Sequence, residues 1–112
     1  MTMRQFQTST LEQRHVFDAD FETHPLEVAW ASEAIFFVDA EQLEGVGSLL
    51  LKVQISVDGV NWLDEGTAFD PISGTTRAFR RVSHFGGWLR LQGIFAGAAC
   101  AYKLTIHLVI KE

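Results

Sequence analysis

Apolar residues recur at every second position over long stretches of this chain. Odd positions are apolar between residues 49 and 57, and even positions are apolar between residues 100 and 110. Between Trp88 and Phe95, residues Leu89, Leu91 and Phe95 share one side. Successive side chains of a β-strand point to opposite faces, so this period of two predicts strands that bury one face.

Shorter alternations predict four further strands, at residues 15–22, 26–30, 34–38 and about 76–83. The segment 34–38 is apolar on both faces, which predicts a central strand. Turn-forming pairs such as Asp58-Gly59 separate these segments, and no stretch of the sequence shows a helical stripe. We therefore predict an all-β fold: an antiparallel β-sandwich, jelly-roll-like, with about eight strands.

The length of 112 residues suits one domain. Its 47% hydrophobic content excludes an intrinsically disordered chain, which is poor in apolar residues. We predict a single β-sandwich domain over residues 1–112, in which residues 1–11 form an N-terminal arm or edge strand around Phe6. This arm pairs either with the edge of its own sheet or with a neighbouring subunit, and the sequence leaves both open.

Cys100 is the only cysteine, which excludes an internal disulfide, and its place among apolar residues predicts a buried, inert thiol. Residues 1–8 lack the apolar core of a signal peptide, and no apolar stretch is long enough to cross a bilayer. We expect synthesis in a reducing cytoplasm, with incorporation into a larger particle still open, and no membrane partner.

Charge is divided unevenly along the chain, whose formal net charge is −5. Residues 1–76 contain 13 acidic and 3 basic residues, whereas residues 77–112 contain 1 acidic and 6 basic residues. Arginine suits bidentate capture of carboxylate or phosphate. The candidate interface arginines of the basic part are Arg77, Arg80, Arg81 and Arg90.

The acidic part contributes Asp18, Asp20 and Glu22, which the predicted strand over residues 15–22 places on one face as an acidic ladder. We expect the two charge sets to pair within one chain or between neighbouring copies. A sequence pI near 5.3 and the lack of interleaved exposed aromatic residues argue against a nucleic-acid partner. The acidic ladder is not expected to bind a metal ion by itself, because residues two apart on a strand are about 6.6 Å apart, which is too far for them to chelate one ion.

No catalytic motif is present in the sequence: it has no nucleophile elbow, phosphate-binding loop or dinucleotide fingerprint. The four histidines are dispersed, without the spacing of a metal site. We therefore predict that the protein is not an enzyme and that it uses no cofactor and no metal.

Residues 53–62 read VQISVDGVNW, and residues 87–91 read GWLRL. Both segments resemble small discoidin-like, galactose-binding β-sandwich modules, including those found in phage virion proteins. In such folds the Asp-Gly pair makes a tight turn and the Trp packs across the strands. The resemblance covers these two segments only, and it implies a fold rather than a ligand.

Two functional hypotheses follow. The first is a self-associating structural protein, such as a head-decoration, adaptor or tail component of a phage-like particle. Its interface candidates are Phe6, the four arginines and the acidic ladder, and its expected partner is a second copy or a larger assembly. The alternative is a carbohydrate- or small-ligand-binding module whose candidate residues are Asp58, Asn61 and Trp62.

Overall fold

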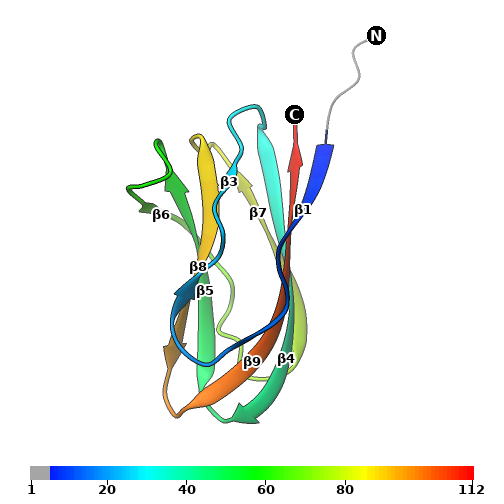
Figure 1. The fold of residues 1–112 in the computed structure, drawn as a ribbon, viewed down its shortest axis with the longest axis vertical. Coiled ribbons are helices and arrows are strands. Elements are labelled where there is room, and N and C mark those ends of the chain that lie inside the picture. The colour runs from blue at the N-terminus through cyan, green and yellow to red at the C-terminus, as the bar shows by residue number, and fades with distance from the viewer. Residues whose placement is uncertain (1–5) are drawn as a thin grey trace.

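The computed structural model describes residues 6–112, which form two antiparallel sheets packed face to face (Figure 1). The prediction of an all-β sandwich is confirmed. The first five residues of the predicted arm lie outside the described residues. Nine strands occur in the described part: β1 (Phe6–Phe17), β2 (Phe21–Glu22), β3 (Leu26–Glu27), β4 (Glu33–Gly45), β5 (Ser48–Ser56), β6 (Leu63–Ala68), β7 (Thr76–Ser83), β8 (Trp88–Ala96) and β9 (Cys100–Lys111).

Sheet A has the strand order β1-β9-β4-β7, and sheet B has the order β2-β8-β5-β6, with β3 also paired to β8. The first half of the chain pairs with the second half in reverse order: β1 with β9, β2 and β3 with β8, β4 with β7, and β5 with β6. The pairings β4–β9 and β5–β8 join these pairs within each sheet. The chain is therefore one long hairpin rolled into two sheets, as in a jelly roll.

The core lies between the sheets and is built from the alternating positions. The even residues of β4 from Ala34 to Ala40 and of β9 from Cys100 to Ile110 are buried. Sheet B contributes odd residues, such as Leu49 on β5 and Leu91 on β8. The strands β5, β7, β8 and β9 begin and end within about one residue of the predicted segments, because burial of one face produced the alternation. As predicted, β4 is central in sheet A.

The predicted single strand over residues 15–22 is wrong. β1 ends at Phe17, and the chain crosses from sheet A to sheet B before β2 begins at Phe21. The rings of Phe17 and Phe21 stack across this crossover with centroids 3.8 Å apart. Asp18 and Asp20 therefore lie in the crossover, where the Phe95 backbone N–H donates to Asp20 Oδ1 at 2.8 Å, and the acidic ladder does not form.

Three stretches of strand lack the alternation that would have predicted them. One is β6, which is polar and exposed along the edge of sheet B. Another is the end of β4, after Ala40. The third is the beginning of β1, which runs along the edge of its own sheet with Phe6 opposite Lys111.

Within residues 6–112, no helix has the length and hydropathy of a membrane-spanning segment.

Gly93 on β8 pairs with Phe21 on β2, whose ring occupies the space that a side chain at position 93 would need. We expect Gly93→Ala to lower the free energy of unfolding by about 1–3 kcal/mol through overpacking. This corresponds to a fall of roughly 5 °C or more in the melting temperature, measured by circular dichroism. Gly74→Ala is the matched control, because nothing lies within 4 Å of a side chain added there. Equal melting temperatures for the two variants would contradict this account of the packing.

Candidate functional site

One part of the outer face of sheet B carries a network of polar side chains, while Leu50 and Ile94 lie opposite each other farther along the same face. The buried Gln54 Nε2 donates to Asp64 Oδ1 at 3.0 Å and to Gln92 Oε1 at 3.2 Å, and Arg90 Nε donates to Gln54 Oε1 at 2.8 Å. Lys52 Nζ donates to Asp64 Oδ2 at 3.0 Å. The hydrogen bonds from Gln54 and Lys52 hold the pKa of the Asp64 carboxyl below its usual range. These five side chains therefore bond to one another within one chain.

The outer face of sheet A is apolar at its centre. Phe37 on β4 and Phe79 on β7 lie opposite each other, with ring centroids 6.0 Å apart, and are 42% and 45% exposed. We call this pair the aromatic ridge. Beside it, the half-buried Ile35 and Val109 are directly opposite on β4 and β9. The Arg81 guanidinium carbon lies 5.4 Å from the centroid of the Phe79 ring.

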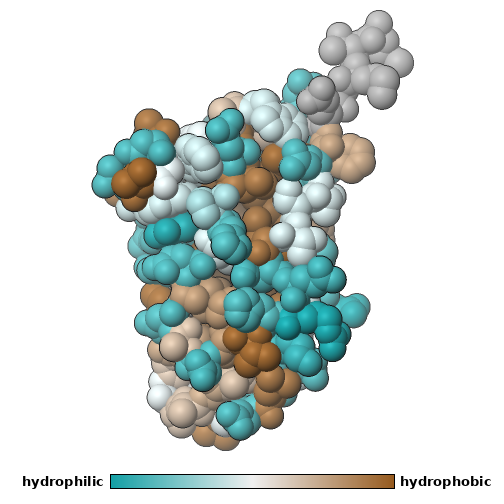
Figure 2. Space-filling view, in the orientation of Figure 1, coloured by the Kyte–Doolittle hydropathy of each residue, from teal (hydrophilic) through white to brown (hydrophobic). Residues whose placement is uncertain are grey.

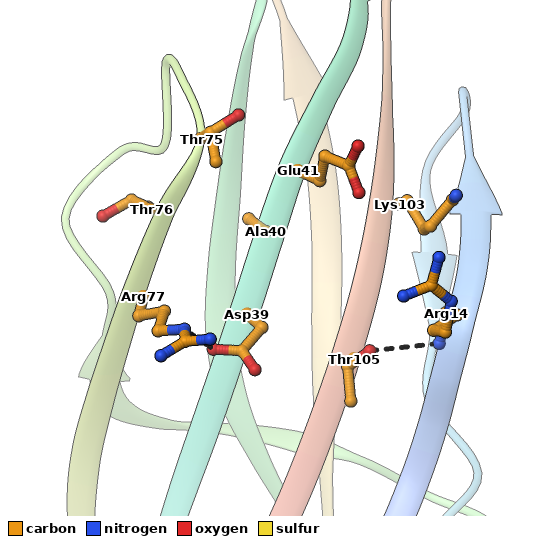
Figure 3. Close-up of a pocket in the computed structure, with 9 residues that line it drawn as sticks. All are labelled: Arg14, Asp39, Ala40, Glu41, Thr75, Thr76, Arg77, Lys103 and Thr105. Carbon is orange, nitrogen blue, oxygen red and sulfur yellow. Dashed lines mark hydrogen bonds and ion pairs between the residues drawn. The ribbon is translucent and has the colours of Figure 1, made fainter.

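Two depressions flank the ridge, as the register of sheet A shows. On the side toward the C-terminus is a cavity of about 320 Å³, here called the hollow, whose lining includes Glu33, Ile35, Arg81, Ser83, Val109 and Lys111. On the other side is a cavity of about 370 Å³, the charged groove, lined by the nine residues of Figure 3. In the groove Arg77 Nε is 3.0 Å from Asp39 Oδ1, and the Arg14 N–H donates to Thr105 Oγ1 at 3.1 Å (Figure 3).

The acidic and basic parts of the chain meet strand by strand on sheet A. Each of β7, β8 and β9 pairs only with strands that precede residue 57. The register places three acidic residues directly opposite basic ones: Glu33 opposite Lys111, Asp39 opposite Arg77, and Glu41 opposite Lys103. The division of charge along the sequence therefore follows the nested pairing of the two halves.

The four predicted interface arginines lie on three different surfaces. Arg77 and Arg81 are on the outer face of sheet A. Arg80 faces the opposite way, toward the edge where β6 and β7 meet, and one of its guanidinium nitrogens is 3.5 Å from Asp70 Oδ2. Arg90 belongs to the network on sheet B. The structure therefore does not gather them into one basic patch.

The remaining interface candidates lie near the N-terminal edge. Phe6 begins β1 and is exposed, while Glu22 lies on β2. Within residues 6–112, no ion pair joins Asp18, Asp20 or Glu22 to an arginine.

The turn between β5 and β6 is built around Asp58. Its Oδ1 accepts hydrogen bonds from the Val60 and Asn61 backbone N–H groups, both at 2.9 Å, and from the Ser56 hydroxyl at 3.0 Å. Asn61 Nδ2 donates to Asp58 Oδ2 at 2.9 Å. The Asn61 and Val60 backbone donors in particular hold the pKa of Asp58 well below its usual range. Gly59 supplies the positive φ, +79°, that this turn requires.

Trp62 follows this turn and is half-buried, with the Arg90 guanidinium carbon 4.3 Å from its ring centroid. The tip itself is apolar, because Val57, Val60 and Leu63 are all highly exposed. Figure 2 shows apolar residues at the β5–β6 tip, and others along the opening between the two sheets. Asp58 and Asn61 use their polar atoms within the turn, which leaves fewer of them for sugar hydroxyl groups.

The aromatic ridge was not among the predicted site residues. Its signal in the sequence was the segment 34–38, which is apolar on both faces: the even residues fill the core, and Phe37 is left outside. No group of three or more His, Cys, Asp or Glu side chains within residues 6–112 is placed to hold a metal ion.

No family model matches this chain, and no curated protein matches it, so the discoidin-like resemblance gains no support from either comparison. Solved structures do match. The SPBc2 prophage-derived protein YomS has a TM-score of 0.63 at 10% identity, over 100% of this chain and 97% of that one. A chain of infectious bursal disease virus, Gx strain, has a TM-score of 0.63 at 13% identity, over 98% of this chain and 33% of that one. At these identities the similarity shows a shared fold.

The hydrogen bonds to Asp58 predict a pH dependence of stability. A carboxyl whose pKa is lower in the folded state stabilises the fold above the unfolded pKa of about 4, and loses this contribution as the pH falls toward the folded pKa. We expect Asp58→Asn to unfold more readily than the wild type at about pH 7, and the difference to shrink at about pH 2.5. Urea denaturation at both pH values measures this. Asp18→Asn, in the exposed crossover, is the control, and a wild-type advantage over Asp58→Asn that is equal at both pH values would contradict the prediction.

Proposed function

We propose that this protein is a non-enzymatic structural subunit of a virus- or phage-like particle, and that it acts by associating with copies of itself. The aromatic ridge carries the proposal. Phe37 and Phe79 stand half-exposed beside Ile35 and Val109 on the outer face of sheet A. Contiguous exposed apolar surface marks contact sites, because burying it gains about 25 cal/mol per Å².

The fold supports the same proposal. The full-length match is to a prophage-derived protein, and the second match lies within a longer chain of a virus. A rolled sandwich of this size supplies flat outer faces on a rigid core, which suits repeated contacts between copies. Within such a particle we propose the role of a head-decoration, adaptor or tail component. The protein would be synthesised in the cytoplasm and then join the particle.

The charge distribution bears on how such copies would associate. Acidic and basic side chains of sheet A already face one another within one chain, as in the Asp39–Arg77 pair. Association therefore does not require the charge halves of neighbouring copies to meet. Exposed ion pairs contribute little free energy, so the apolar centre of the face is the main source of affinity.

This proposal predicts a defined oligomer in solution. Light scattering coupled to size-exclusion chromatography should give one mass above that of a 12.5-kDa monomer. That mass should persist between about 0.1 and 0.5 M salt, because screening weakens exposed ion pairs but not apolar contacts. Negative-stain microscopy of the same fractions shows whether larger assemblies form.

The competing function is carbohydrate binding, and the same preparation tests it. A strict monomer at high protein concentration, together with a glycan-array signal that Trp62→Ala abolishes in a folded variant, would overturn the structural proposal. Circular dichroism of Trp62→Ala is the folding control, since Trp62 also packs against Arg90.

A further inference from the structure

We infer that the charged groove on sheet A binds an acidic sugar, a sugar ring that carries a carboxylate, and that Arg14 holds the carboxylate. The groove is formed within one chain, so this binding would not depend on self-association. Three features of the groove support it: the strained backbone of Arg14, the balance of charge, and the hydroxyl groups of the lining.

Arg14 has a backbone conformation that arginine rarely adopts. Its φ is 51°, in the left-handed region, where residues with a β-carbon are strained. It lies between Glu12 and His15, where the pairing of β1 with β9 is irregular. Irregular strand pairing of this kind can turn a side chain in a direction that a regular strand does not allow. Here it places the Arg14 side chain in the groove (Figure 3), and such local strain is concentrated at binding sites.

The side chains of the groove carry one more positive than negative charge. Arg77 Nε lies 3.0 Å from Asp39 Oδ1, and Lys103 is directly opposite Glu41 in the strand register. Arg14 forms no ion pair within residues 6–112. Its guanidinium group lies on the same side of the groove as the Lys103 amine (Figure 3).

This excess of one charge favours a ligand with a single negative charge. Arginine can bind a carboxylate through two parallel hydrogen bonds, so Arg14 suits this group. One carboxylate would balance the excess positive charge. A zwitterion such as an amino acid would leave it unbalanced, and a phosphate dianion would exceed it.

The hydroxyl groups of the groove suit a ligand that has hydroxyl groups of its own. Thr105 Oγ1 accepts a hydrogen bond from the Arg14 N–H, and Thr75 Oγ1 accepts one from the Gln42 N–H, both at 3.1 Å. A hydroxyl that accepts a hydrogen bond still has a proton to donate, and within residues 6–112 neither threonine donates it. Glu41 adds an acceptor on the β4 side of the groove (Figure 3).

The groove therefore offers donors and an acceptor to ring hydroxyls, beside a cation for a carboxylate. Its volume of about 370 Å³ is near the lower end of the range for ligand pockets, about 300–1,000 Å³. This size suits a small ligand such as one sugar ring.

An NMR titration of the isotope-labelled protein with sodium glucuronate tests the ligand. We expect the amide signals of groove residues, including Arg14, Thr75 and Thr105, to shift along one saturating curve. Glucose and sodium acetate, added at the same ionic strength, should bind about tenfold more weakly or worse, because each lacks one of the two groups that the groove would contact. Inorganic phosphate should also bind more weakly than glucuronate.

Substitution of Arg14 tests the site. Arg14→Ala should weaken glucuronate binding about tenfold or more, since it removes a charged hydrogen-bond donor. Arg81→Ala is the matched control: it removes the same charge from the same face of sheet A, outside the groove, and should leave the affinity unchanged. Arg14→Gly should weaken binding as Arg14→Ala does but melt at a higher temperature than Arg14→Ala, because glycine adopts a positive φ without strain.

Several results would overturn this inference without touching the proposed function, which is tested by the mass of the oligomer. Acetate or phosphate that binds as tightly as glucuronate would exclude an acidic sugar as the preferred ligand. Equal effects of Arg14→Ala and Arg81→Ala, or no shift of the groove signals with glucuronate, would exclude the site. Glucuronate binding that Trp62→Ala abolishes and Arg14→Ala preserves would place the sugar at the β5–β6 turn instead. Equal melting temperatures of Arg14→Ala and Arg14→Gly would contradict the strained backbone.

Discussion

Strands β4 and β9 lie side by side from the Glu33–Lys111 pair to the Gly45–Cys100 pair, and this ladder joins the first half of the chain to its last strand. Their inward residues, including Phe36, Val38 and Ile106, are almost completely buried against sheet B. A shift by one residue would turn every one of these side chains outward, so the core fixes the register. The same register leaves Phe37 on the outer face. The feature that stabilises the sandwich is thus also the one that creates its apolar outer surface.

The nested pairing of the strands also explains why charge is divided along the sequence. In a rolled hairpin, residues early in the chain face residues late in the chain, so an acidic first part and a basic second part place opposite charges on adjacent strands. Asp39 and Arg77 show this directly. The charge pattern favours the correct pairing of strands that are distant in sequence.

Much of the fold could be predicted from the sequence, because apolar and polar residues alternate in strands that bury one face. β5, β7, β8 and β9 are examples. β6 could not be predicted, because Leu63–Ala68 is exposed and no burial imposes a pattern on it. The strand predicted over residues 15–22 failed because an alternating pattern continues through Asp18 and Asp20, although the chain there changes sheets.

The candidate site was harder to predict, because it depends on which strands become neighbours. Phe37 and Phe79 are 42 positions apart, and no local pattern shows that they form one ridge. The four arginines are the opposite case, because they are close in sequence but lie on different surfaces. Their closeness in sequence suggested one surface, but Arg80 and Arg81 are adjacent on β7 and therefore point to opposite faces.

The two edges of sheet A have a consequence for the behaviour of the protein at high concentration. The register of β1 against β9 is interrupted on both sides of Glu12, and Arg14 there has a left-handed backbone with φ of 51°, so the strand offers only short regular runs. The other edge, β7, carries three arginines. Bulges and positive charges both hinder the addition of further strands. Both edges of sheet A are thus poorly suited to sideways growth into fibrils when copies of the protein are crowded together.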